Sequence, residues 1–110
     1  MDVQVKKLHR VDVITVEGRV DSSTAARLGE ALESSFASGT RNIVIDLAGV
    51  DYMSSAGLRE LVAALKRAKS SGGDVRLSAP SERVAEVLEI AGLDSIFGVY
   101  GDQVEAVGSF

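Results

Sequence analysis

The order of apolar and polar positions predicts an early hairpin. Residues 3–5 and 11–16 alternate apolar with polar side chains or carry β-branched ones, which is typical of strands. The polar stretch between them predicts the connecting turn. Gly18 is expected to end the second strand, and Ser22 or Ser23 is expected to cap the helix that follows.

Apolar residues spaced three or four apart then predict two helices with a strand between them. The strand covers the β-branched run 42–47. Glycine and serine clusters at 38–40 and 70–73 are expected to end the helices. The apolar face of the first helix contains Ala25, Leu28, Leu32 and Phe36, with Ala31 beside them; that of the second contains Leu58, Leu61, Val62, Leu65 and Ala68.

The last third of the chain continues the alternation. A strand is predicted at 75–79, a helix from Pro80 with Ser81 as its cap, a short strand at 99–100 and a helical turn at 103–107. This order predicts an α/β fold with a mixed, mostly parallel sheet and helices packed mainly on one side. The positions expected to be buried in this part are Val84, Val87, Leu88, Ala91, Leu93, Ile96 and Phe97.

Composition narrows the class of protein. The chain has 110 residues, which fits a single domain over 1–110, and 45% of them are hydrophobic. The net charge of −4 argues against a nucleic-acid partner. Without cysteine there is no disulfide or thiol chemistry. No apolar run approaches the ~20 residues that cross a membrane, and no signal peptide is evident, so a cytoplasmic protein without a membrane partner is expected.

Residues 51–58 contain the most informative stretch, Asp-Tyr-Met-Ser-Ser-Ala-Gly-Leu. It lies between the strand at 42–47 and the second helix, and either Ser54 or Ser55 can cap that helix. Hydroxyl groups at the positive end of a helix tolerate an added negative charge. The simplest interpretation is that both serines only cap the helix and turn the chain.

The residues give little support to an enzyme. A catalytic triad would need His9 beside Ser54 or Ser55, but His9 belongs to the early hairpin. No segment matches the phosphate-binding loop GxxxxGK[ST]. Asp46 at the end of a strand resembles a phospho-accepting aspartate, yet the further acidic residues that would bind Mg²⁺ are missing. We therefore expect no catalytic activity, cofactor or metal ion.

Three motifs, taken together in order, resemble the STAS domain (sulphate transporter and anti-sigma-factor antagonist) from about residue 11 to 99. The first motif, Gly-Arg-Val-Asp at 18–21, resembles the family loop after the second strand. The second, the run 42–53, resembles the central strand and the loop that follows it. The third, Ser-Ser-Ala-Gly-Leu at 54–58, resembles the signature Asp-Ser-Ser/Thr-Gly-Leu. More narrowly, the chain resembles a stand-alone anti-sigma-factor antagonist.

The resemblance implies a switch by phosphorylation of Ser55, the hydroxyl residue two before the signature glycine. Two positions depart from the signature, because Ser54 replaces its Asp and Ala56 replaces its second Ser/Thr. Asp21 matches an acidic residue that lies near the switch in the family. The partner-binding surface implied by the resemblance comprises Asp21, Met53, Ser54, Ser55, Ala56, Gly57 and Leu58.

The implied partner is an anti-sigma factor, often itself a serine kinase, which the unphosphorylated protein would bind so that a sigma factor is released. A serine phosphatase would reverse the modification. Two other functions remain open. The chain could be an interaction module in another signalling or lipid-transport complex, or it could bind a small ligand or nucleotide.

Overall fold

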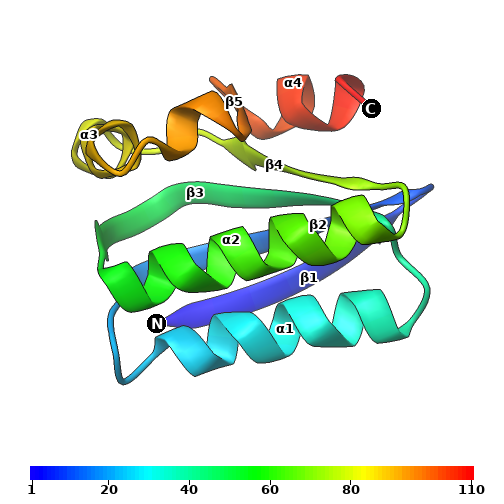
Figure 1. The fold of residues 1–110 in the computed structure, drawn as a ribbon, viewed down its shortest axis with the longest axis horizontal. Coiled ribbons are helices and arrows are strands. Elements are labelled where there is room, and N and C mark those ends of the chain that lie inside the picture. Colours follow the sequence, from blue (N-terminus) through cyan, green and yellow to red (C-terminus); the bar gives the residue numbers. More distant parts are fainter.

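The computed structural model describes residues 1–110 as one five-stranded sheet with covering helices (Figure 1). The elements in chain order are β1 (Asp2–Leu8), β2 (Val11–Val20), α1 (Ala25–Ala37), β3 (Asn42–Met53), α2 (Ser55–Ser70), β4 (Asp74–Ser78), α3 (Glu82–Ile90), the 3₁₀ turn η1 (Leu93–Ser95), β5 (Gly98–Tyr100) and α4 (Gln103–Gly108).

The strands lie in the sheet in the order in which they occur in the chain. β1 and β2 are antiparallel and form the predicted hairpin, with Leu8 opposite Val11. The pairs β2–β3, β3–β4 and β4–β5 are parallel, and each is connected through helical structure. The predicted mixed, mostly parallel sheet is therefore confirmed.

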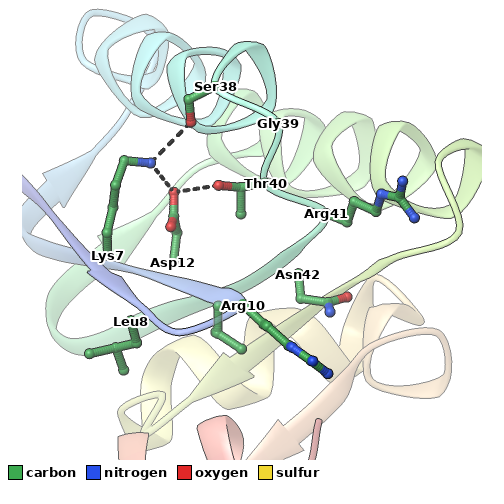
Figure 2. Close-up of a pocket in the computed structure, with 10 residues that line it drawn as sticks. Lys7, Leu8, Arg10, Asp12, Ser38, Gly39, Thr40, Arg41 and Asn42 are labelled. Carbon is green, nitrogen blue, oxygen red and sulfur yellow. Dashed lines mark hydrogen bonds and ion pairs between the residues drawn. The ribbon is translucent and has the colours of Figure 1, made fainter.

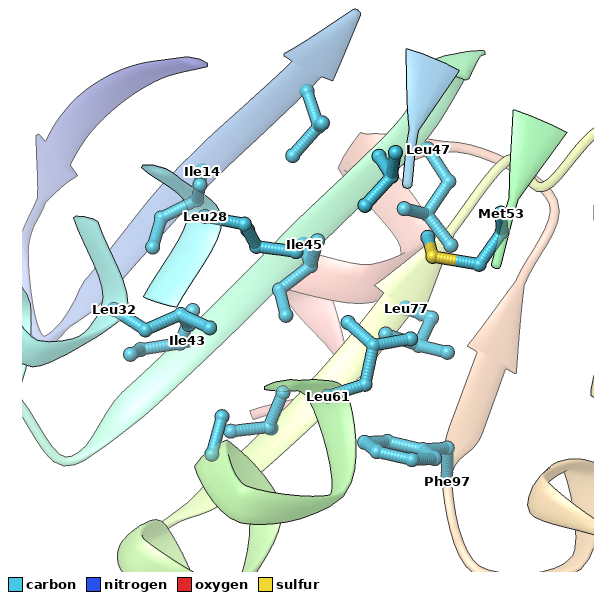
Figure 3. Close-up of a cluster of buried hydrophobic side chains, with 14 of the residues drawn as sticks. Ile14, Leu28, Leu32, Ile43, Ile45, Leu47, Met53, Leu61, Leu77 and Phe97 are labelled. Carbon is cyan, nitrogen blue, oxygen red and sulfur yellow. The ribbon is translucent and has the colours of Figure 1, made fainter. Parts of the chain in front are cut away.

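One face of the sheet carries most of the core. Alternation along β3 directs Ile43, Ile45 and Leu47 toward the face covered by α1, α2 and α3, where 20 buried residues form one cluster (Figure 3). The opposite face carries a cluster of four buried residues, to which α4 contributes Ala106. The residues predicted from the sequence to be buried, and found so, include Val44, Ile45, Leu61, Leu65 and Leu88.

Two strands run further than the sequence pattern predicts. Gly18 does not end β2, because the strand continues to Val20 through shifts in its register with β3. Gly18 has φ +94°, a conformation that glycine adopts without a Cβ penalty. β3 likewise continues to Met53, so residues 51–53 are strand where we expected a turn.

Three smaller expectations are wrong. Neither Ser22 nor Ser23 caps α1; the helix follows Thr24, and the carbonyl of Asp21 accepts hydrogen bonds from the N–H groups of Thr24 and Ala25. Ala91 and Ile96 are exposed, because α3 ends at Ile90 and the chain turns away through η1. Pro80 precedes α3 rather than starting it, whereas Ser81 caps the helix as predicted.

Candidate functional site

The start of α2 is fixed to the carboxyl end of the sheet by Ser54. Its backbone N–H donates to the carbonyl of Val20 at 2.8 Å, which joins the end of β2 to the first turn of the helix. Its side-chain oxygen accepts from the N–H of Gly57 at 3.4 Å and so caps the helix. Serine and aspartate are about equally good caps, so the departure from the family signature at this position preserves the capping function.

Ser55 is the first residue of α2 and is exposed, as predicted. Its hydroxyl makes no hydrogen bond with another group of the protein, since the cap is supplied by Ser54. The unpaired N–H groups and the dipole of a 16-residue helix favour negative charge at this end. The site can therefore carry a phosphate without disturbing an existing contact.

Gly57 allows α2 to lie close to β2 and β3. A Cβ at this position would clash with Sδ of Met53 and would come within 2.7 Å of Cγ1 of Val20. Met53 itself is only 3% exposed and belongs to the core beneath the helix. The expectation that Met53 helps to form a contact surface is therefore wrong: its side chain supports the site from below. Ala56 and Leu58 are half-buried and pack against the same core.

Asp21 lies just beyond Val20, at the same edge of the sheet, in a tightly bonded loop. The hydroxyl of Ser23 donates a hydrogen bond to the Asp21 carboxylate and contributes most to lowering the pKa of Asp21 from 3.8 to about 2. The backbone N–H of Ser23 also donates to this carboxylate and makes the next largest contribution. Arg19 contributes further, since its Nε lies 3.0 Å from the carboxylate. The guanidinium also stacks over the ring of Tyr52, with 3.9 Å from Cζ to the ring centroid. Asp21 is thus ionised at neutral pH and held in place.

A shallow groove with a volume of about 520 Å³ extends from Ser55 along α2. Its walls come from α2 and from the segment that follows α3. The residues lining it are Ser55, Leu58, Arg59, Val62, Ala63, Lys66, Ala91 and Leu93. Neither Arg59 nor Lys66 has a carboxylate within ion-pair distance. The groove is therefore mostly apolar and is flanked by two free positive charges.

Sequence reasoning missed this groove and the stacked Arg19–Tyr52 pair. The spacing of Ser55, Arg59 and Lys66 along one helix was visible, because residues three or four apart share a face. The opposite wall of the groove was not visible in the sequence, because Ala91 was predicted to be buried. The Arg19–Tyr52 contact depends on the register of β2 and β3, which places these residues opposite each other after the bulge at Gly18.

The other candidate residues are not arranged as a catalytic triad or as a metal site. His9 is exposed in the turn between β1 and β2, at the opposite end of the sheet from Ser55. Both oxygens of Asp46 are occupied, one by the N–H of Ala48 and the other by the side chain of Gln103. No three His, Asp or Glu side chains are arranged to hold a metal ion. None of the helices is long and apolar enough to cross a membrane.

Comparison with known proteins agrees with this geometry. The chain is 33% identical to BtrV of Bordetella bronchiseptica, which is named as a candidate anti-sigma factor antagonist; the alignment covers 100% of this chain and 95% of BtrV. It is also 33% identical to the anti-sigma-B factor antagonist of Staphylococcus aureus, over 84% of this chain and 86% of that protein.

Solved structures share the fold. A candidate anti-sigma factor antagonist from Thermotoga maritima superposes with a TM-score of 0.92 at 26% identity, covering 97% of this chain and 92% of the other. The phosphorylated form of the Bacillus protein SpoIIAA superposes with a TM-score of 0.78 at 18% identity over 98% of each chain, which shows a common fold. Residues 2–106 match the STAS domain family, and this chain belongs to that family.

Proposed function

We propose that this chain is an anti-sigma-factor antagonist and that the phosphorylation state of Ser55 controls its binding to an anti-sigma factor. The observation that carries the proposal is the position of Ser55, which is exposed at the start of α2 and lines one end of the groove. The names of the relatives BtrV and the S. aureus protein support the same class of partner. The chain acts by contact, and the bond-making step belongs to the partner kinase.

The groove gives the partner a definite chemistry. Its apolar floor favours an apolar side chain of the anti-sigma factor, because covering it removes apolar surface from water. Arg59 and Lys66 favour acidic side chains around that anchor, since neither cation is paired within this chain. Asp21, at the same edge of the sheet, adds a fixed negative charge at neutral pH that favours a basic group of the partner.

A phosphate on Ser55 opposes this contact without altering the fold. The kinase transfers the γ-phosphoryl group of ATP to Oγ of Ser55, with release of ADP and of the hydroxyl proton. The product carries about −1.5 to −2 charges at the mouth of the groove. Acidic groups of the partner are then repelled, and a doubly charged group would have to lose its water where the partner covers it. Dephosphorylation by a serine phosphatase restores binding.

The test combines phosphate mapping with binding of the cognate anti-sigma factor, which is also the source of the kinase. After incubation with the kinase and ATP, mass spectrometry should place the phosphate on Ser55 and leave Ser54 unmodified. Ser55→Ala should bind the partner as the native chain does, and Ser55→Asp should bind more weakly. Ser34→Asp adds the same charge on the exposed side of α1 and serves as the matched control. Phosphate only on Ser54, or equal affinities of Ser55→Ala and Ser55→Asp, would contradict the proposal.

A further inference from the structure

A second concave site lies at the opposite end of the sheet from Ser55. It is formed between the β1–β2 turn and the loop that joins α1 to β3, and its volume is about 500 Å³ (Figure 2). Pockets that hold small ligands have volumes in this range. The lining side chains that could contact a ligand through charge or hydrogen bonds include those of Lys7, Arg10, Asp12, Thr40 and Arg41. None of these residues takes part in the surface around Ser55.

The charge of this pocket is opposite to that of the whole protein. Lys7, Arg10 and Arg41 give three positive charges and Asp12 gives one negative charge, a net of +2 in a chain of net −4. Lys7 is already paired with Asp12, since Nζ lies 2.9 Å from Oδ2. Arg10 and Arg41 have no carboxylate within 4.0 Å. Figure 2 shows their guanidinium groups at the rim, pointing away from Asp12 and from each other. Both side chains are exposed and can turn inward to an anion, whose phosphate-type oxygens match their planar donors.

Arg10 occupies a backbone conformation that disfavours it. Its φ is +72°, in the left-handed region where glycine or asparagine is usual. The two-residue turn between β1 and β2 would be less strained with either of those residues. A strained backbone at an arginine on the rim of a pocket points to a role for its side chain.

Asp12 supplies a second type of contact. Its side chain is only 4% exposed, and Oδ2 accepts from both Nζ of Lys7 and Oγ1 of Thr40. Oδ1 accepts no hydrogen bond from the protein. A carboxylate oxygen left without a donor is suited to accept from a hydroxyl group. The pocket therefore combines donors for an anion with an acceptor for a neutral polar group.

We propose that this pocket binds a small phosphomonoester that carries a hydroxyl group near its phosphate. Arg10 and Arg41 turn inward to hold the phosphate, and Oδ1 of Asp12 accepts from the hydroxyl group. The site is separate from Ser55, so the proposal stands or falls independently of the function proposed above.

The test uses the full chain, labelled with ¹⁵N, and three probes: glycerol 3-phosphate, propyl phosphate and inorganic phosphate. Glycerol 3-phosphate should shift the amide signals of Arg10 and of residues 39–42, and should bind more tightly than propyl phosphate, which lacks the hydroxyl groups. Absence of shifts at these positions, with millimolar glycerol 3-phosphate, would overturn the proposal. Equal affinity for all three probes would overturn the role of Asp12.

Matched variants separate the site from general charge effects. Arg10→Asn removes one guanidinium group and introduces asparagine, which tolerates positive φ. Arg41→Gln removes the other guanidinium group. Each should weaken binding by about tenfold, the loss typical of one charge-assisted contact. Arg83→Gln, which removes an exposed and unpaired arginine of α3, should leave the affinity unchanged. Undiminished affinity in the Arg10→Asn, Arg41→Gln double variant, with native thermal unfolding, would refute the assignment.

Discussion

The backbone N–H of Ser54 donates to the carbonyl of Val20 at 2.8 Å, and this bond ties the start of α2 to the end of β2. The same serine caps the helix through its side chain. Ser55, one residue further on, is left with no structural contact of its own. Ser54 therefore maintains the turn, and the hydroxyl of Ser55 remains available for the proposed phosphorylation.

Replacement of Ser54 by alanine should lower the free energy of unfolding by about 0.5–2 kcal/mol, because the N–H of Gly57 loses its cap. Ser54→Asp should be close to the native protein, since aspartate caps equally well and its charge suits a helix N-terminus. Urea denaturation at neutral pH measures both variants. Equal stability of the alanine and native proteins would show that the 3.4 Å contact contributes nothing.

Gly57→Ala should destabilise the fold by about 1–3 kcal/mol, the usual cost of overpacking a core. The added methyl group meets Met53 and Val20, which are both buried beneath α2. Gly108→Ala is the matched control, because a Cβ at that helical position meets no atom within 4 Å. It should be neutral or slightly stabilising. A loss of stability in the Gly108 variant as large as that in the Gly57 variant would refute the packing argument.

The ionisation of Asp21 should appear in the pH dependence of stability. Its folded pKa of about 2 is lower than the ordinary value of 3.8, so the folded state favours the charged form. The stabilisation is fully present above pH 3.8 and is lost as the pH falls toward 2. An NMR titration of the carboxyl carbon should give the low midpoint directly. Asp21→Asn should remove this part of the acid dependence, and an unshifted midpoint near 3.8 would contradict the hydrogen-bonded loop.

Much of the fold was predictable because periodicity in the sequence reflects burial. The strand at 42–47 and the helical face of Leu61 and Leu65 are local patterns, and the structure confirms them. The extension of β2 past Gly18 was not predictable, since it depends on pairing with β3 across a bulge. A glycine that permits positive φ looks the same in sequence whether it ends a strand or bends one.

The candidate site was predictable only in part. Ser55 could be placed at a helix start from its neighbours, and the structure confirms its exposure. The burial of Met53 could not be predicted from the sequence, because β3 continues through this residue and directs its side chain beneath α2. The groove also needs the turn after α3 to bring Leu93 beside α2, and that is a tertiary relationship.

The last prediction concerns how a phosphate on Ser55 affects the fold itself. The phosphorylated protein should unfold at the same temperature as the native chain or at a higher one. A negative charge at a helix N-terminus is worth about 0.3–1 kcal/mol. Arg59, one turn further along α2, lies where it can pair with the phosphate. Differential scanning calorimetry of the two forms at low salt measures the shift.

Variants of Arg59 separate these two contributions. Arg59→Gln should reduce the gain in unfolding temperature caused by the phosphate, whereas Arg83→Gln on α3 should leave it unchanged. High salt should also reduce the gain, because it screens charges at the surface. If the phosphorylated form unfolded at a lower temperature, the modification would act by loosening α2. The loss of partner binding would then follow from a change in the fold, and the interface mechanism would be wrong.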